Sequence, residues 1–139
     1  MALARREHSR LELQRKLAAR GFPSAEIARV LDALAGERLQ SDARHAESYI
    51  RSRADRGYGP RRIAAELKVR GTAADQIRCA LDAADCDWSA LARRADRKKF
   101  GVDPGGGFDV MAKRRRYLET RGFAADQIKA VLNASDDFD

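Results

Sequence analysis

The segment KLAARGFPSAEIARVLDAL, residues 16–34, decides the fold, because the chain contains its pattern three times. Residues 66–84 read ELKVRGTAADQIRCALDAA and residues 117–135 read YLETRGFAADQIKAVLNAS, and the three copies align without a gap. Each copy places a leucine, an Arg-Gly pair, an isoleucine and a second leucine at the same positions, at offsets of 50 and then 51 residues. Self-similarity at such a period indicates a chain built from repeated structural modules.

Each copy predicts two helices joined by a tight turn. Apolar residues recur at helical spacing, as Ile27, Val30 and Leu31 do in the first copy. The Arg-Gly pair predicts a helix end, because glycine adopts the left-handed conformation after a helix without steric cost. The next helix follows at once: Pro23 suits its first turn, and Thr72 resembles a capping residue at the corresponding place in the second copy.

A further helix precedes each pair. The pattern predicts it over residues 42–56 in the second copy, ending at Gly57, and over residues 88–100 in the third. In the second copy Pro60 then starts the next helix. In the third copy the inward side is expected to carry Trp88, Leu91, Ala92 and Ala95.

The first copy has room only for a stub of this helix, residues 1–6, so we expect an N-terminally truncated first module, either because the natural start lies upstream or because this module is incomplete. Ser9 and Glu12 then form a capping box for its second helix. We therefore predict an all-α fold, a tandem repeat of three-helix, helix-turn-helix-like modules. The first repeat spans residues 1–36 and the second residues 37–86; the third, residues 87–139, carries a glycine-rich insertion (102–108) and an acidic tail.

Composition favours an anionic partner. The 139 residues include 28 Lys and Arg against 21 Asp and Glu, a formal net charge of +7. Such a balance favours polyanions or acidic protein surfaces. The first ten residues contain arginines and no apolar run, and no uncharged stretch approaches membrane-spanning length. We expect a soluble, cytoplasmic protein.

The sequence indicates no enzyme, cofactor or metal. Cys79 and Cys86 form no CxxC pair, His8 and His45 are far apart in sequence, and Cys79 is expected to be a small buried residue. The three glycines 105–107 follow no strand and precede no GK[ST], so a flexible loop is favoured over a phosphate cradle. We predict no catalytic residues.

The basic residues fall into two rows and one dense run. Arg44 and Arg51 share an outward face of the helix over 42–56, and Arg61 and Lys68 repeat that relation on the next helix. The dense run is Lys113 to Arg116, four successive cations. Successive residues of a helix point in different directions, so these four cannot form a single contact row. Tyr58 is interpreted as a packing wedge, and Tyr58 and Tyr117 as the only plausible exposed rings. The candidates for binding a partner or DNA are Arg44, Arg51, Arg53, Arg56, Arg61, Arg62, Lys68, Arg70, Lys113, Arg114, Arg115 and Arg116.

These motifs, in this order and spacing, resemble the RecX family of RecA regulators over nearly the whole chain. The matching blocks are REHSRLEL (6–13), YIRSRADRGYGPRRIAAELKVRG (49–71), W-x-x-LA from Trp88, KKFG (98–101) and RGFAADQIKAVL (121–132). The best-matched block contains Arg53, Tyr58, Arg61 and Arg62.

The resemblance implies an elongated, curved monomer that lies in the groove of the RecA filament on single-stranded DNA. It implies a negative modulator that limits filament extension or promotes disassembly, and so reduces ATP hydrolysis, strand exchange and coprotease activity. Homologous recombination, DNA repair and the SOS response are the processes concerned. The alternative is an autonomous DNA-binding protein with one helix-turn-helix per module; direct nucleic-acid binding is otherwise expected to be weak.

Overall fold

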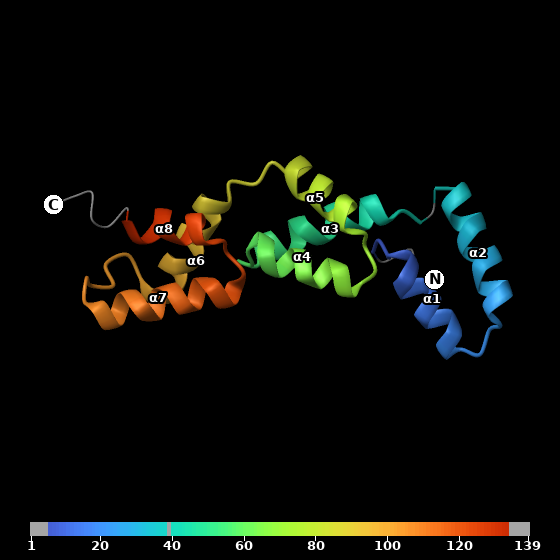
Figure 1. The fold of residues 1–139 in the computed structure, drawn as a ribbon, viewed down its shortest axis with the longest axis horizontal. Helices are drawn as coiled ribbons and strands as arrows, with labels where there is room; N and C mark the ends of the chain where they lie inside the picture. Colours follow the sequence, from blue (N-terminus) through green and yellow to red (C-terminus); the bar gives the residue numbers. More distant parts are fainter. Residues whose placement is uncertain (1–5, 39, 134–139) are drawn as a thin grey trace. The chain divides into compact units, whose positions relative to one another are not determined.

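The chain is all-helical in the computed structural model, which describes residues 6–38 and 40–133 (Figure 1). The helices of these residues are α1 (Arg10–Ala19), α2 (Ser24–Gly36), α3 (Asp42–Asp55), α4 (Pro60–Val69), α5 (Ala74–Ala83), α6 (Trp88–Phe100), α7 (Phe108–Arg121) and α8 (Ala125–Asn133). The prediction of an all-α fold is confirmed. The expected helices over 42–56 and 88–100 correspond to α3 and α6, and Pro60 begins α4 as predicted.

The helices form two compact units. One consists of Met1–Tyr49 with Glu66–Ala84, and the other of Ile50–Ala65 with Asp85–Asp139. The division passes through α3 and α4, and so does not follow the repeat boundaries 1–36, 37–86 and 87–139, which stay a prediction. The acidic tail and all but Arg6 of the expected stub helix lie outside the described residues, and Arg6 is not helical.

The Arg-Gly pairs end their helices as the sequence predicts. Gly21, Gly71 and Gly122 all lie in the left-handed region, with φ of +88°, +92° and +97°. The capping box is also present: the Ser9 hydroxyl accepts from the Glu12 amide at 3.1 Å, and the Glu12 carboxylate accepts from the Ser9 amide at 3.1 Å. Helix α1 therefore has its first turn fixed by its own side chains.

Two predictions about the second copy are wrong. Thr72 does not cap α5, whose N-cap is Ala73; the Thr72 side chain is buried, as is Phe123 at the same position of the third copy. In these two copies the position after the Arg-Gly pair is thus used for packing and not for capping. Cys79 is exposed, because α5 turns Ile77 and Ala80 inward instead.

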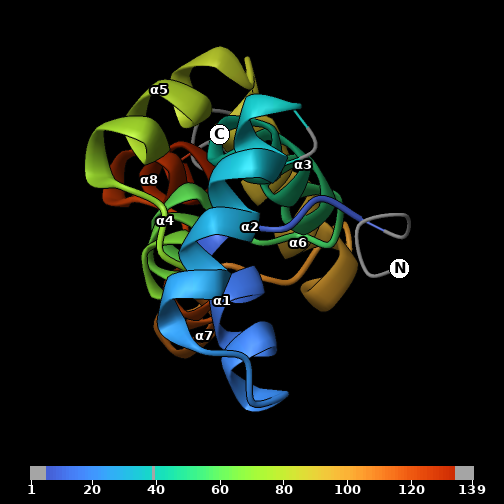
Figure 2. The ribbon, with the colours of Figure 1, turned by 90° about the vertical axis from the view of Figure 1, so that its right-hand side faces the viewer.

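In the first unit, α1 and α2 pack side by side (Figures 1 and 2). Leu13, Ile27 and Leu31 form the core of this pair, and Leu17 and Leu34 pack against it. Each large side chain buried in this way contributes roughly 1.5–3 kcal/mol relative to exposure.

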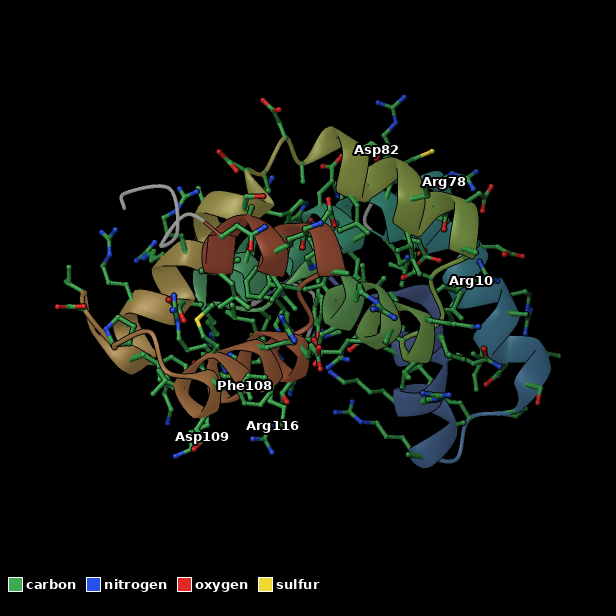
Figure 3. The ribbon with its side chains drawn as sticks, turned by 60° about the vertical axis from the view of Figure 1, so that its left-hand side comes forward. Arg10, Arg78, Asp82, Phe108, Asp109 and Arg116 are labelled. Atoms are coloured by element: carbon green, nitrogen blue, oxygen red, sulfur yellow. The ribbon has the colours of Figure 1, made fainter. Side chains whose placement is uncertain are left out.

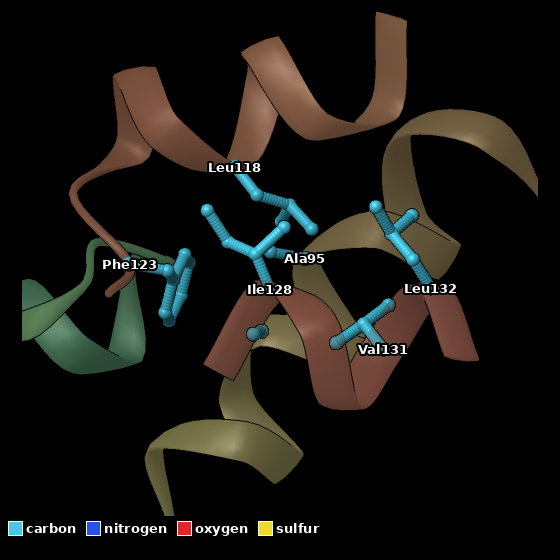
Figure 4. Packing of buried hydrophobic residues seen from close by; sticks show 7 residues of the cluster. Ala95, Leu118, Phe123, Ile128, Val131 and Leu132 are labelled. Carbon is cyan, nitrogen blue, oxygen red and sulfur yellow. The ribbon is translucent and has the colours of Figure 1, made fainter. Parts of the chain in front are cut away.

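In the second unit, α6 packs against both α7 and α8. The core consists of Ala92, Ala95, Leu118, Phe123, Ile128, Val131 and Leu132 (Figure 4). Trp88 and Leu91 pack against this cluster, so the predicted inward face of α6 is confirmed. The alanines on α6 let the neighbouring helices approach closely, and Phe123 places the turn after α7 in the core.

Candidate functional site

The candidate site is built around Tyr58, in the turn between α3 and α4. Three guanidinium groups lie near the centre of its ring: Arg53 at 3.8 Å, Arg121 at 4.1 Å and Arg62 at 4.5 Å. Cation–π contacts of this kind attract the guanidinium to the ring face. The half-buried Tyr58 ring therefore packs among three arginines, which agrees with its interpretation as a packing wedge. The ring holds the three guanidinium groups close together.

A second turn of the same unit holds this one in position. The Gly59 amide donates to the Arg121 carbonyl at 2.7 Å, and the Arg61 amide donates to the Gly122 carbonyl at 2.9 Å. A Cβ atom on Gly59 would lie 2.5 Å from the Gly122 carbonyl carbon, so no other residue fits there without movement. Glycine at this position permits two backbones to meet.

Side chains reinforce the contact between the two turns. The Arg121 guanidinium donates to the Arg56 carbonyl at 2.8 Å, and the Arg62 guanidinium donates to the Thr120 carbonyl at 3.3 Å. The start of α4 is thus fixed by backbone and side-chain bonds together. Arg61, which is exposed, projects from this fixed helix start.

A groove of about 430 Å³ adjoins these arginines. Its lining residues are Arg61, Arg62, Glu119, Thr120, Gly122, Phe123, Ala125 and Ile128. Two guanidinium groups against one carboxylate leave the groove cationic, and a positioned guanidinium suits a carboxylate or a phosphate oxygen. The arrangement can hold an anionic group of a partner.

The predicted candidates divide between the two units. In the second unit Arg51, Arg56, Lys113, Arg115 and Arg116 are exposed. In the first unit Lys68 is exposed, Arg44 pairs with Glu7 at 3.1 Å, and Arg70 lies 4.6 Å from the centre of the Tyr49 ring. Figure 3 shows Arg116 projecting from α7.

Arg114 corrects the prediction for the dense basic run. It is 3% exposed, and its guanidinium binds both carboxylate oxygens of Asp96, at 2.9 and 2.8 Å. Successive residues of a helix point in different directions, so one of four consecutive cations on α7 faces α6. Arg114 belongs to the core of the second unit and not to its binding surface.

Sequence reasoning also missed two features. Arg121 was not a candidate, although it contacts Tyr58; its place in the Arg-Gly pair indicated a helix end and gave no sign of this long-range contact. The exposed rings include Phe22 and Phe108, at 49% and 87% exposure, whereas Tyr117 is half-buried and packs edge-to-face on Phe100 at 5.6 Å. The expectation that Tyr58 and Tyr117 are the only exposed rings is wrong.

Several titratable groups of the first unit, among them His8 and Glu12, lie close together near the start of α1. Burial alone would raise the pKa of Glu12, but hydrogen bonds from Arg6 and from the Ser9 amide, with the charges of Arg6 and His45, lower it to about 2. Burial, followed by the charges of Arg6 and Lys16, lowers the pKa of His8. The neutral ring fits its contacts: Nδ1 donates to the Arg6 carbonyl at 3.0 Å and Nε2 accepts from Lys16 at 3.1 Å. This cluster stabilises the fold.

No described feature indicates catalysis. Among residues 6–38 and 40–133, no group of three or more His, Cys, Asp or Glu side chains could hold a metal ion. Burial, with the charges of Asp55 and Asp85, raises the pKa of the Cys86 thiol, which disfavours the nucleophilic thiolate. Within the same described residues, no helix has the length and apolar character needed to cross a membrane.

Fold and site together define a small all-α protein of repeated helical modules with a cationic surface. The family model for the first three-helix domain of RecX matches residues 2–34, and the model for its second three-helix domain matches residues 41–81. Regulatory protein RecX of Halorhodospira halophila is 44% identical over 137 residues, which cover 99% of this chain and 85% of that protein. Regulatory protein RecX of Chromohalobacter salexigens is 49% identical over 130 residues, 94% of this chain and 85% of that protein. The chain belongs to the RecX family of regulatory proteins.

Solved structures agree on the fold. The crystal structure of RecX from Lactobacillus salivarius superposes with a TM-score of 0.79 at 21% identity, covering 99% of this chain and 91% of that one. A second crystal structure of regulatory protein RecX gives a TM-score of 0.80 at 22% identity, over 96% of this chain and 66% of that one. Tandem three-helix domains are therefore the architecture of this chain.

Proposed function

We propose that this chain is a negative modulator of the RecA recombinase that acts in the cytoplasm. It binds in the groove of the RecA filament on single-stranded DNA and inhibits filament extension, ATP hydrolysis, strand exchange and coprotease activity. Recombination, DNA repair and the SOS response are thereby restrained. The observation that carries this proposal is membership of the RecX family over nearly the whole chain.

The site around Tyr58 supports a mechanism by occupation. Arg61 projects from a helix start that is already fixed by the Gly122 carbonyl, so little backbone conformational entropy is lost when its side chain meets a partner. Its guanidinium would meet carboxylates on the recombinase or phosphates of the DNA. The exposed cations of α7 extend the same attraction.

The test is the DNA-dependent ATPase activity of RecA in the presence of this protein. Substoichiometric protein is expected to suppress hydrolysis while it binds naked DNA only weakly and with strong salt dependence. Unchanged hydrolysis at saturating protein contradicts the proposal. Tight, sequence-selective duplex binding that survives moderate salt supports an autonomous DNA-binding protein instead.

The variant Arg61→Glu tests the site itself. The Arg61 side chain is exposed and only its backbone amide holds the turn, so the fold is retained while the concentration required for inhibition rises about tenfold, equivalent to about 1.4 kcal/mol. Arg78→Glu is the matched control, because Arg78 is an exposed arginine of α5 that is not among the candidate residues. Equal weakening by both variants would show that net charge, and not this site, governs inhibition.

A further inference from the structure

Two of the three Arg-Gly turns receive the start of another helix. In the first unit, the hydroxyl of Ser9, the N-cap of α1, donates to the Arg70 carbonyl at 2.6 Å, and a Cβ on Gly71 would lie 2.5 Å from Leu11 Cβ. In the second unit, the residue before α4, Gly59, donates its amide to the Arg121 carbonyl at 2.7 Å. We call this contact, a helix start seated on the carbonyls of an Arg-Gly turn, the turn joint.

The remaining Arg-Gly turn, residues 20–22, is open. No atom of the described residues lies within 4 Å of a Cβ placed on Gly21. Phe22 is 49% exposed, whereas Thr72 and Phe123, at the same position of the other copies, are 3% and 1% exposed. The first turn thus presents an aromatic side chain at a position where both other copies bury theirs.

One helix start of the kind that docks on an Arg-Gly turn, that of α7, also has no turn against it among the described residues. The helices that lead into the Arg-Gly turns are α1, α4 and α7, and only the starts of α1 and α4 are seated on a turn among the described residues. Helix α7 begins after Gly107, which makes no side-chain capping bond and has no atom within 4 Å of an added Cβ. Phe108 is 87% exposed and Asp109 is exposed beside it (Figure 3).

We propose that copies of this chain associate head to tail through a third turn joint, in which the start of α7 of one copy docks on residues 20–22 of the next. The first-turn amides of α7 would donate to the turn carbonyls at the end of α1, so helix ends of opposite partial charge meet. Exposed Arg20 and Asp109 have opposite charges, and Phe22 and Phe108 would be removed from water together.

Helix α7 shares with α4 a glycine immediately before the helix, whereas the joint at α1 has Ser9 at this place. In the joint at α4, Gly59 leaves no room for a Cβ against the backbone of residues 122–123, and Gly107 is likewise a glycine. Helix α7 starts three residues earlier in the repeat than α4, because Met111 and not Phe108 aligns with Pro60. The two starts therefore correspond by their preceding glycine, and not by repeat position.

The association is expected to be heterologous and weak. The two halves of the joint are different surfaces, so successive contacts form an open chain or a closed ring according to the rotation between copies. The contact involves few residues, and small contacts are weak, so we expect a dissociation constant of about 0.1–1 mM. Dilute protein remains monomeric, as expected from the sequence.

Sedimentation equilibrium of the full chain between about 10 μM and 2 mM spans the expected range. The weight-average mass is expected to rise with concentration above that of the monomer. Gly107→Val adds a branched side chain in open space, so it leaves helicity unchanged and raises the dissociation constant at least about tenfold by the steric argument for Gly59. Gly106→Val is the matched control and leaves association unchanged. A constant monomer mass, or equal effects of both variants, overturns the proposal.

Disulfide trapping gives a second readout, independent of RecA. In a chain with Cys79→Ser and Cys86→Ser, the variants Phe22→Cys and Phe108→Cys are mixed and oxidised with glutathione disulfide. The mixed dimer is expected to exceed its statistical share, because only that pair is brought together. A statistical mixture, or an excess of either homodimer, contradicts the head-to-tail contact whether or not the protein inhibits RecA.

Discussion

The buried ion pair between Asp96 and Arg114 gives a prediction about stability. Asp96→Ala removes the carboxylate that binds Arg114 through two hydrogen bonds of 2.9 and 2.8 Å, and leaves a guanidinium of 3% exposure between α6 and α7. Removing one partner of a buried pair costs about 3–5 kcal/mol, because the remaining charge has lost both water and counter-ion. That is a large fraction of the stability of a small domain.

The assay is urea unfolding at pH 7, followed by circular dichroism, with three comparisons. Asp96→Ala is expected to lower the free energy of unfolding by about 3–5 kcal/mol. The double variant Asp96→Leu with Arg114→Met replaces both charges by apolar groups and is expected to recover most of the loss. Arg115→Met, the exposed neighbour, is expected to stay within about 0.5 kcal/mol of the parent. A loss below about 1 kcal/mol for Asp96→Ala would refute the burial of the pair.

Three further outcomes are expected. Gly21→Asn is expected to change the free energy of unfolding by less than about 1 kcal/mol, because asparagine tolerates a positive φ. Gly122→Asn is expected to lower it by at least about 2–3 kcal/mol, because the new side chain would collide with the Arg62 backbone in α4. Thermal melts of the two variants distinguish these outcomes. Since the folded pKa of Glu12 is about 2, its stabilisation is complete above the unfolded value of 4.5 and is lost as the pH falls from about 4.5 to 2; Glu12→Gln removes this pH dependence of unfolding. Charge reversal of four outward residues leaves helicity intact and weakens inhibition of RecA hydrolysis, and lost helicity would show that their faces were misplaced. These residues are Arg44, Arg51, Arg61 and Lys68.

Helix positions were predictable because their signals are local. The Arg-Gly pairs, Pro60 and the Ser9–Glu12 box each specify a helix end through backbone conformation or a bond within one turn. The inward face of α6 followed from the same periodicity. Such features depend on the covalent chain alone, and the three repeats supply them three times.

The burial and contacts of a side chain were not predictable where they depend on an element distant in the sequence. Arg114 stands in a run of four cations, and only the position of Asp96 on another helix makes it a core residue. Arg121 reaches Tyr58 across more than sixty positions of the chain. Thr72 has the composition of a cap, yet its position is used for packing. In each case a long-range contact overrides a local tendency.

The glycines of the two turns show where local and long-range requirements coincide. Gly122 needs its left-handed φ for the helix end, which the sequence indicates, and it also lies against the Arg62 backbone, which the sequence does not indicate. Gly21 has only the first requirement within the described residues. A repeat that retains glycine in all three copies therefore hides a difference: two turns are occupied by a helix start and one is open. That difference is the physical basis for the proposal that residues 20–22 contact another copy of the chain.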